Sequence, residues 1–144
     1  MTITATRDAA LINRIANSDG VREFVAADDR LMDWTPLIAR PFEETGAVVL
    51  TNGADAVAAF TYTAPSIFQA HLLFAKTCRG RKAIDTARAM LKWMFDNGAT
   101  IVWGAAPRAN RKVGIFGRLI GGRVMPSSDA TDIVFECRLD GLAR

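Results

Sequence analysis

The spacing of apolar positions along the chain predicts seven strands and four helices. Alternating or continuous apolar residues, many of them β-branched, indicate strands, and apolar residues that recur every three or four positions indicate helices. The predicted strands are 2–7, 46–51, 56–63, 67–76, 100–105, 123–126 and 131–139. The predicted helices run from Asp8 to Asp19-Gly20, from Val21 to Trp34, from Arg81 to Asn97 and from Asn110 to Ile120.

Turn and cap residues separate these elements. Asp8 and Asn110 are suited to cap the helices that follow them, and Asn52-Gly53 is a strong hairpin signal. Pro36 and Pro41 bracket a segment that we expect to be irregular. The order of elements predicts an α/β (α+β) fold, with a mixed, largely antiparallel central sheet of six to seven strands flanked by about four helices. We expect the strand–helix–strand unit 67–105 to form a right-handed parallel crossover.

Composition indicates one ordinary globular domain. The chain has 144 residues, of which 50% are hydrophobic and 23% are charged, so we expect a single domain over residues 1–144. No apolar run reaches the roughly 18–20 residues of a membrane span, and no signal-peptide pattern opens the chain, which favours the cytoplasm. Cys78 and Cys137 fit no metal spacing, so we expect free thiols and no metal.

Positive charge is concentrated in the middle of the chain. The whole chain carries only +3, but residues 76–123 hold eleven Lys or Arg against two acids, a net charge of +9. The other 96 residues carry −6 by the same count. This asymmetry indicates a polyanionic ligand, and a solvated basic surface is the alternative. Nucleic acid fits less well, because aromatic residues are not interleaved with the basic ones.

A short basic loop between a predicted strand and a predicted helix is the strongest candidate site. The segment Cys78-Arg79-Gly80-Arg81-Lys82-Ala83 follows the apolar run 67–74 and opens the helix that begins at Arg81. The first amides of a helix have no acceptor inside the helix, and the helix dipole adds partial positive charge there. Together with the side chains of Arg79, Arg81, Lys82 and Arg88, these amides predict a site for a phosphate-bearing ligand.

This order of elements and this loop resemble the GNAT superfamily of acyl-CoA-dependent N-acyltransferases. The family carries an Arg/Gln-x-x-Gly-x-Gly/Ala segment in which backbone amides hold the coenzyme A pyrophosphate, and 79–84 stands in that place. Asn110 and Ile120-Gly121-Gly122 stand where the family's next helix begins and ends. The resemblance covers essentially the whole chain and implies acetyl-CoA as cosubstrate. The residues that it implies in coenzyme binding are Leu73, Phe74, Ala75, Arg79, Gly80, Arg81, Lys82, Ala83 and Asn110.

The chain departs from the family pattern at several positions. Lys82 and Ile84 replace small residues of the loop, and the Lys82 side chain either adds a contact to the pyrophosphate or obstructs it. Many members carry a Tyr in the last helix as the acid for the departing thiolate. The one tyrosine of this chain, Tyr62, lies on a different strand, and Phe116 or Gly117 stands at the family's position. Neither of these two residues can donate a proton.

Acyl transfer to an amine needs a proton acceptor and donors for the thioester oxygen. His71 is the only histidine and our tentative base, and a surface or core histidine with a hydrogen-bond partner is the alternative. By resemblance, a backbone N–H of Leu73, Phe74 or Ala75 donates to the oxygen, and we select Phe74. Further candidates, each with an ordinary surface or core role as the simpler interpretation, are Glu43 and Glu44 for a cationic amine, Glu136 as another base, Lys76 and Arg111 for the ribose phosphate, and Cys78 as a nucleophile.

The resemblance implies an N-acetyltransferase that moves an acetyl group from acetyl-CoA to a primary amine of a small molecule or peptide by direct attack. The altered loop and the missing tyrosine keep a second hypothesis open, a catalytically silent GNAT-fold binding or structural protein, for example a phage-derived one. Late strands often pair across dimers in this fold, so a homodimer is one expectation, and no membrane partner is expected. The resemblance places acceptor specificity in residues 21–45 and 123–131.

Overall fold

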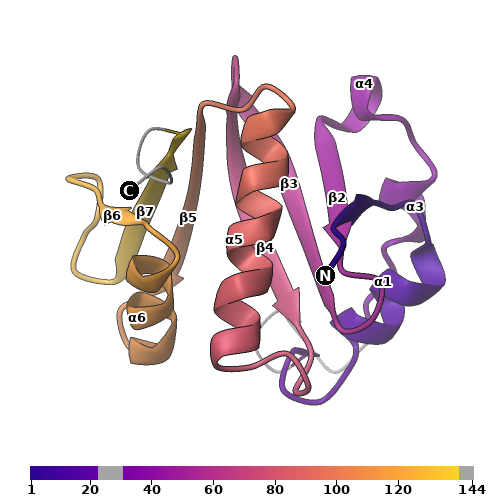
Figure 1. The fold of residues 1–144 in the computed structure, drawn as a ribbon, viewed down its shortest axis with the longest axis horizontal. Helices are drawn as coiled ribbons and strands as arrows, with labels where there is room; N and C mark the ends of the chain where they lie inside the picture. Colours follow the sequence, from indigo (N-terminus) through magenta and orange to yellow (C-terminus); the bar gives the residue numbers. More distant parts are fainter. Residues whose placement is uncertain (23–30, 140–144) are drawn as a thin grey trace.

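A seven-stranded sheet forms the centre of the molecule. A computed structural model describes residues 1–22 and 31–139 of the chain. The strands are β1 (Thr4–Ala5), β2 (Ala47–Thr51), β3 (Ala56–Ala64), β4 (Ile67–Phe74), β5 (Ile101–Pro107), β6 (Arg123–Val124) and β7 (Asp132–Arg138). They lie in the order β1-β2-β3-β4-β5-β7-β6 (Figure 1). Neighbouring strands are antiparallel except β4 and β5, which are parallel, so the predicted sheet class and the parallel connection are confirmed.

Two of the helices begin where the sequence places their caps. The described helices are α1 (Ala9–Ala16), α3 (Thr35–Ile38), α4 (Phe42–Thr45), α5 (Arg81–Asp96) and α6 (Arg111–Leu119). The Asp8 carboxylate accepts from the Leu11 N–H at 3.1 Å, and the Asn110 side chain accepts from the Val113 N–H at 3.4 Å. Both predicted caps are therefore confirmed, and each satisfies a first-turn amide. Within the described ranges, no helix combines the length and the apolar character needed to cross a membrane.

Helices pack on both faces of the sheet. In Figure 1, α5 lies across β3 and β4, and α6 lies beside β5 and β7. Met90 of α5 joins Phe60 and Phe74 in the larger core, whereas Ile12 of α1 joins Leu73 in the core on the opposite face. Successive strand residues point to opposite faces, which is why Leu73 and Phe74 belong to different cores. Met90, Phe60 and Ile12 are completely buried, and each stabilises the fold by roughly 1.5–3 kcal/mol.

The segment between α1 and β2 differs from the prediction. The predicted helix 21–34 falls largely on residues 23–30, outside the described residues, and 31–34 are not helical. Helix α3 instead begins at Thr35, inside the segment that the two prolines led us to expect as irregular. Pro36 occupies the first turn of α3, where its fixed φ suits a helix and its missing N–H leaves no bond unmade. The proline therefore marks a helix start here.

The Asn52-Gly53 hairpin is confirmed, with residues 52–55 as the loop between β2 and β3. Gly53 has a φ of +82°, a backbone conformation that glycine adopts readily. The Asn52 side-chain oxygen accepts from the N–H groups of Ala54, Asp55 and Ala56 at 3.0 to 3.1 Å. The Gly53 N–H donates to the Thr51 hydroxyl at 2.9 Å, so side chains of Thr51 and Asn52 together satisfy the amides of the loop.

Strands β4 and β5 pair over only part of their length. Ile67–Gln69 lies beside Ile101–Trp103, and the pairing stops there. Beyond that point β4 continues to Phe74 on β3, and β5 continues to Pro107 on β7. The two strands diverge after Gln69, so a gap opens between residues 70–74 of β4 and 104–107 of β5. We call this the β4–β5 gap, and it widens toward the loop that precedes α5.

Candidate functional site

The edge of β4 that faces the gap presents backbone N–H groups. The Ala75 N–H donates to the Asp55 carbonyl at 2.8 Å, in the direction of β3. Because N–H groups alternate along a strand, that of Leu73 also points toward β3, whereas those of Phe74 and Leu72 point toward the gap. Of the three predicted oxygen donors, Phe74 therefore faces the gap, and the Ala75 N–H is already engaged. Leu72 is a donor that the sequence analysis did not consider.

An apolar pocket lies at the gap on the side covered by α5 and α6. Its volume is about 120 Å³, and its lining comes from β4, β5, α5 and α6, including Leu72, Leu91 and Phe116. The ring of Phe116 stands edge-on to that of Phe74, with 6.3 Å between the ring centroids. A concave apolar site with a few backbone polar groups at its edge suits a narrow, mostly apolar ligand arm.

The N-terminus of α5 is open to an anion. Gly80 is the N-cap residue with a φ of +61°, and no side chain caps the helix. Among the described residues, no acceptor bonds the N–H groups of 81–83, and the helical ladder starts with the Ile84 N–H on the Gly80 carbonyl at 3.2 Å. These amides and the positive end of the helix dipole together form an anion site beside the gap.

Arg79 has partners inside the protein. Its guanidinium donates to the carbonyls of Phe74 at 2.6 Å, Cys78 at 3.4 Å and Gly20 at 3.1 Å. It therefore ties the end of β4 to the turn that follows α1. Its positive charge stays beside α5, and N–H groups on both terminal nitrogens of its guanidinium already bond backbone carbonyls.

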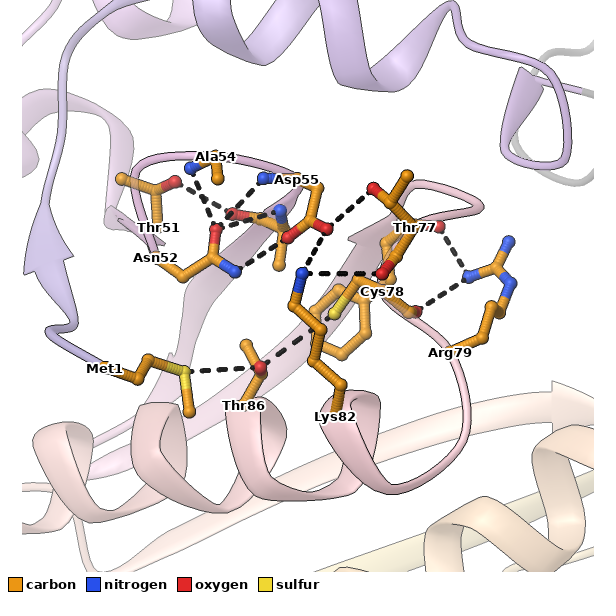
Figure 2. A network of polar contacts seen from close by, with 12 residues as sticks. Met1, Thr51, Asn52, Ala54, Asp55, Thr77, Cys78, Arg79, Lys82 and Thr86 are labelled. Carbon is orange, nitrogen blue, oxygen red and sulfur yellow. Dashed lines mark hydrogen bonds and ion pairs between the residues drawn. The ribbon is translucent and has the colours of Figure 1, made fainter.

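Arg81 and Lys82 differ in exposure and in partner. Lys82 Nζ lies 2.5 Å from a carboxylate oxygen of Asp55, in the β2–β3 hairpin loop (Figure 2). Arg81 pairs with Asp85 at 3.4 Å, and its side chain is 88% exposed. Exposed pairs of this kind contribute little, so an incoming anion can displace Asp85. The structure thus leaves Arg81 open to a ligand and directs Lys82 elsewhere.

His71 lies in β4 at the height of the gap. It pairs with Ala59 of β3, and its position in the alternation places it on the α1 face with Leu73. Among the described residues, no hydrogen-bond partner contacts its ring, and the residue is open to solvent. Partial burial lowers the pKa of His71, so the imidazole is neutral at pH 7. A neutral imidazole can accept a proton, and an exposed ring without a partner is equally typical of a surface histidine.

The family's position for a catalytic acid holds no hydroxyl group. Gly117 packs beneath Phe135, and a Cβ atom there would lie 2.9 Å from the Phe135 ring. Phe116 is the residue that presents a ring to the pocket. Tyr62 is half exposed and packs edge-on against Phe68 near the start of β4, with 6.0 Å between the ring centroids. The described residues therefore place no tyrosine at the pocket.

The remaining candidates have structural surroundings. Cys78 is a free thiol with no exposed surface, and burial raises its pKa, which argues against a nucleophile. Burial likewise raises the pKa of Cys137, to about 11. Glu136 pairs with arginines of β6 and β7, and Glu44 pairs with Arg40 on the surface. Asn110 caps α6, as described above.

Asp55, which contacts the loop, and Thr77, which belongs to it, are missing from the sequence-based site. Asp55 lies 27 positions before Lys82, in a hairpin loop, and no spacing rule connects such positions. The sequence signal is Lys82 itself, because a lysine in a loop position usually filled by glycine needs a place for its side chain. Only the folded chain shows that the Lys82 side chain contacts the Asp55 carboxylate.

Several solved structures similar to this chain are acetyltransferases. An aminoglycoside acetyltransferase in complex with coenzyme A and kanamycin superposes with a TM-score of 0.72 at 15% identity, over 99% of this chain and 98% of the other. A mutant spermidine N-acetyltransferase from Vibrio cholerae gives 0.73 at 9% identity, over 99% and 97%. The GNAT domain of PAT from S. lividans gives 0.73 at 15% identity, over 95% and 89%. No family model and no curated protein sequence matches this chain.

At these identities the similarity establishes the fold. It agrees with the mixed sheet and with the parallel β4–β5 pair, on which the resemblance in the sequence depended. The chain therefore has the GNAT fold over nearly its whole length.

Proposed function

We propose that this protein is an N-acetyltransferase that transfers an acetyl group from acetyl-CoA to a primary amine of a small molecule or peptide. The observation that carries the proposal is the β4–β5 gap, which leads to the open N-terminus of α5. Structures of similar fold were solved with coenzyme A and with amine-bearing kanamycin, which supports ligands of these classes.

The residues of the chain suit acetyl-CoA in three places. The amides of 81–83 and the Arg81 side chain would hold the pyrophosphate. The gap-facing N–H groups of Leu72 and Phe74 would donate hydrogen bonds to the amide-containing pantetheine arm of acetyl-CoA. The apolar pocket with Phe116 would surround that arm. When bound, acetyl-CoA supplies the activated acyl group. The Phe74 N–H would then donate to the oxygen that gains charge during transfer.

His71 would supply the base. An amine with a pKa near ~10.4 is mostly protonated at neutral pH, so it must lose a proton before it attacks. The neutral imidazole accepts that proton directly or through a water molecule. The acceptor would approach from the α1 face, on which His71 lies. Holding both substrates in attack geometry supplies roughly 7–11 kcal/mol of the barrier, so positioning carries much of the catalysis.

Calorimetric titration with acetyl-CoA tests this proposal. We expect micromolar binding by the wild type and about tenfold weaker binding by Arg81→Gln, because one charge-assisted contact is removed. Lys92→Gln is the matched control, since Lys92 also pairs with an aspartate four residues later on α5 but lies turns away. A thiol-release assay with a polyamine, an aminoglycoside and a lysine-containing peptide then tests transfer.

A catalytically silent GNAT-fold binding or structural protein is the second candidate function. The internal partners of Arg79 and Lys82 and the absence of tyrosine from the pocket favour it. It predicts that no heat is released at millimolar acetyl-CoA, or that binding occurs without thiol release from any amine. Either outcome would replace the transferase proposal.

A further inference from the structure

Asp55 is a buried carboxylate that serves the loop before α5. Its side chain is 10% exposed. One oxygen accepts from Lys82 Nζ at 2.5 Å and from the Thr77 hydroxyl at 2.6 Å, and the other accepts from the Asn52 amide at 2.8 Å. Figure 2 shows these contacts converging between the hairpin loop and the first turn of α5. A buried charge with several donors is rigidly placed, because leaving any donor unpaired is costly.

The backbone of Asp55 adds a third attachment. Its carbonyl accepts from the Ala75 N–H at 2.8 Å, so the hairpin loop holds residues 75, 77 and 82. These three positions lie on both sides of Gly80, the residue that turns the chain into α5. The conformation of the loop that presents the α5 amides is therefore set from the hairpin.

The contact also determines where Lys82 lies. Strand β3 adjoins β4 on the side away from β5, so the pull toward Asp55 leads the lysine away from the β4–β5 gap. An unpaired ammonium near a helix N-terminus is unfavourable, because the dipole is positive there. Asp55 offsets that repulsion while leaving the amides of 81–83 uncovered.

We infer that Asp55 is a positioning residue for the coenzyme: through Thr77 and Lys82 it holds loop 75–82 in the shape that receives a diphosphate. This inference rests on the proposed function and adds a residue to it that touches no ligand. The competing account is that Lys82 binds the diphosphate itself and that Asp55 only restrains it. The two accounts predict opposite signs for the loss of the Asp55 carboxylate.

The test is titration of coenzyme A into the wild type, Asp55→Asn, Lys82→Met and the double variant. Positioning predicts that Asp55→Asn binds about tenfold more weakly, that Lys82→Met binds more weakly, and that the double variant is no weaker than Asp55→Asn. Asp55→Asn that binds as tightly as the wild type, or more tightly, overturns the inference. Asp96→Asn, which removes the exposed partner of Lys92 on the same helix, is the control and should bind normally.

Two further measurements separate positioning from general damage. The KM for acetyl-pantetheine, which lacks the diphosphate, should be the same for Asp55→Asn and the wild type. A KM that rises equally for acetyl-pantetheine and for acetyl-CoA contradicts positioning. Hydrogen exchange of the unliganded protein should show faster exchange in 77–83 for both single variants; unchanged exchange there also contradicts it. If the wild type binds no coenzyme A, the proposed function fails and this inference fails with it. Normal wild-type binding with unaffected variants removes the inference alone.

Discussion

The His71 ring has no hydrogen-bond partner among the described residues and is open to solvent. Arg79 and Lys82, by contrast, are engaged by the backbone and by Asp55. A side chain that is paired contributes to the fold, and an exposed side chain without a partner remains free to contact a ligand. At this scale the distinction between structural and functional residues therefore depends on partners and not on residue type.

The fall of kcat/KM at low pH tests whether His71 is the base. The base must be neutral, and the pKa of His71 is lowered, so kcat/KM should fall only as the pH drops below about 6.5. His71→Gln should lose this limb and reduce kcat by roughly 100-fold, while coenzyme affinity stays unchanged. A pH series of initial rates with both proteins measures this. A His71→Gln enzyme with the wild-type rate would exclude the histidine as base.

Phe116 offers a gain-of-function test. Its ring lines the pocket beside Phe74, where the family often has a tyrosine. Phe116→Tyr adds a phenol that can protonate the departing thiolate, so we expect kcat to rise by about tenfold or more with little change in KM. Phe42→Tyr adds the same group on exposed α4 and should leave kcat unchanged. Equal rates for all three proteins would mean that thiolate protonation does not limit turnover.

At the scale of elements, the hairpin and α5 form one unit through Asp55. Burial raises the pKa of Asp55, but hydrogen bonds from Lys82, Thr77 and Asn52 outweigh it and hold the pKa at about 2. The unfolded value is near 3.8, so this carboxylate stabilises the fold above about pH 4, and the contribution is lost as the pH falls toward 2.

Urea unfolding as a function of pH measures that contribution. The lowered pKa of Asp55 corresponds to a contribution on the order of 1–2 kcal/mol to the free energy of unfolding, after allowance for solvent screening. Asp55→Asn should therefore be less stable than the wild type at pH 5, and the difference should shrink by about that amount at pH 2.5. Other acids with lowered pKa values, such as Asp33, are present in both proteins and cancel in the comparison. The same difference in unfolding free energy at both pH values would contradict a stabilising role for the ionised Asp55 carboxylate.

Periodicity predicted the elements that bury a continuous face, and it was wrong where local contacts decide. The predicted helix 81–97 matches α5 (Arg81–Asp96) closely, because its buried positions recur with helical spacing. Thr2–Arg7 was predicted as a strand, but only Thr4–Ala5 pairs with β2. The loop before α5 was found from its charge and glycine. Its shape could not be predicted, because Asp55 and Gly20 reach it from distant parts of the chain.

At the scale of the whole molecule, part of the basic central segment lies at the starts of two helices that line the same pocket. The pyrophosphate site of the proposed function lies at the start of α5, and Arg111 and Lys112 lie at the start of α6, which also lines the pocket with α5. A coenzyme with several phosphates can use a few such charges, whereas a nucleic acid would need an extended track of them. Charge that is concentrated in this way affects encounter and affinity more than folding.

Salt dependence separates these two uses of the charge. Acetyl-CoA binding should weaken severalfold between about 50 and 300 mM NaCl, because exposed charges are screened over a Debye length of about 10 Å. Acetyl-pantetheine lacks the phosphates, so its KM should change little over the same range. A nucleic-acid binder would instead retain DNA or RNA on a filter at low salt and lose it steeply as salt rises. Filter retention together with salt-independent acetyl-CoA affinity would assign the basic segment to nucleic acid, and the absence of retention leaves it to the coenzyme phosphates.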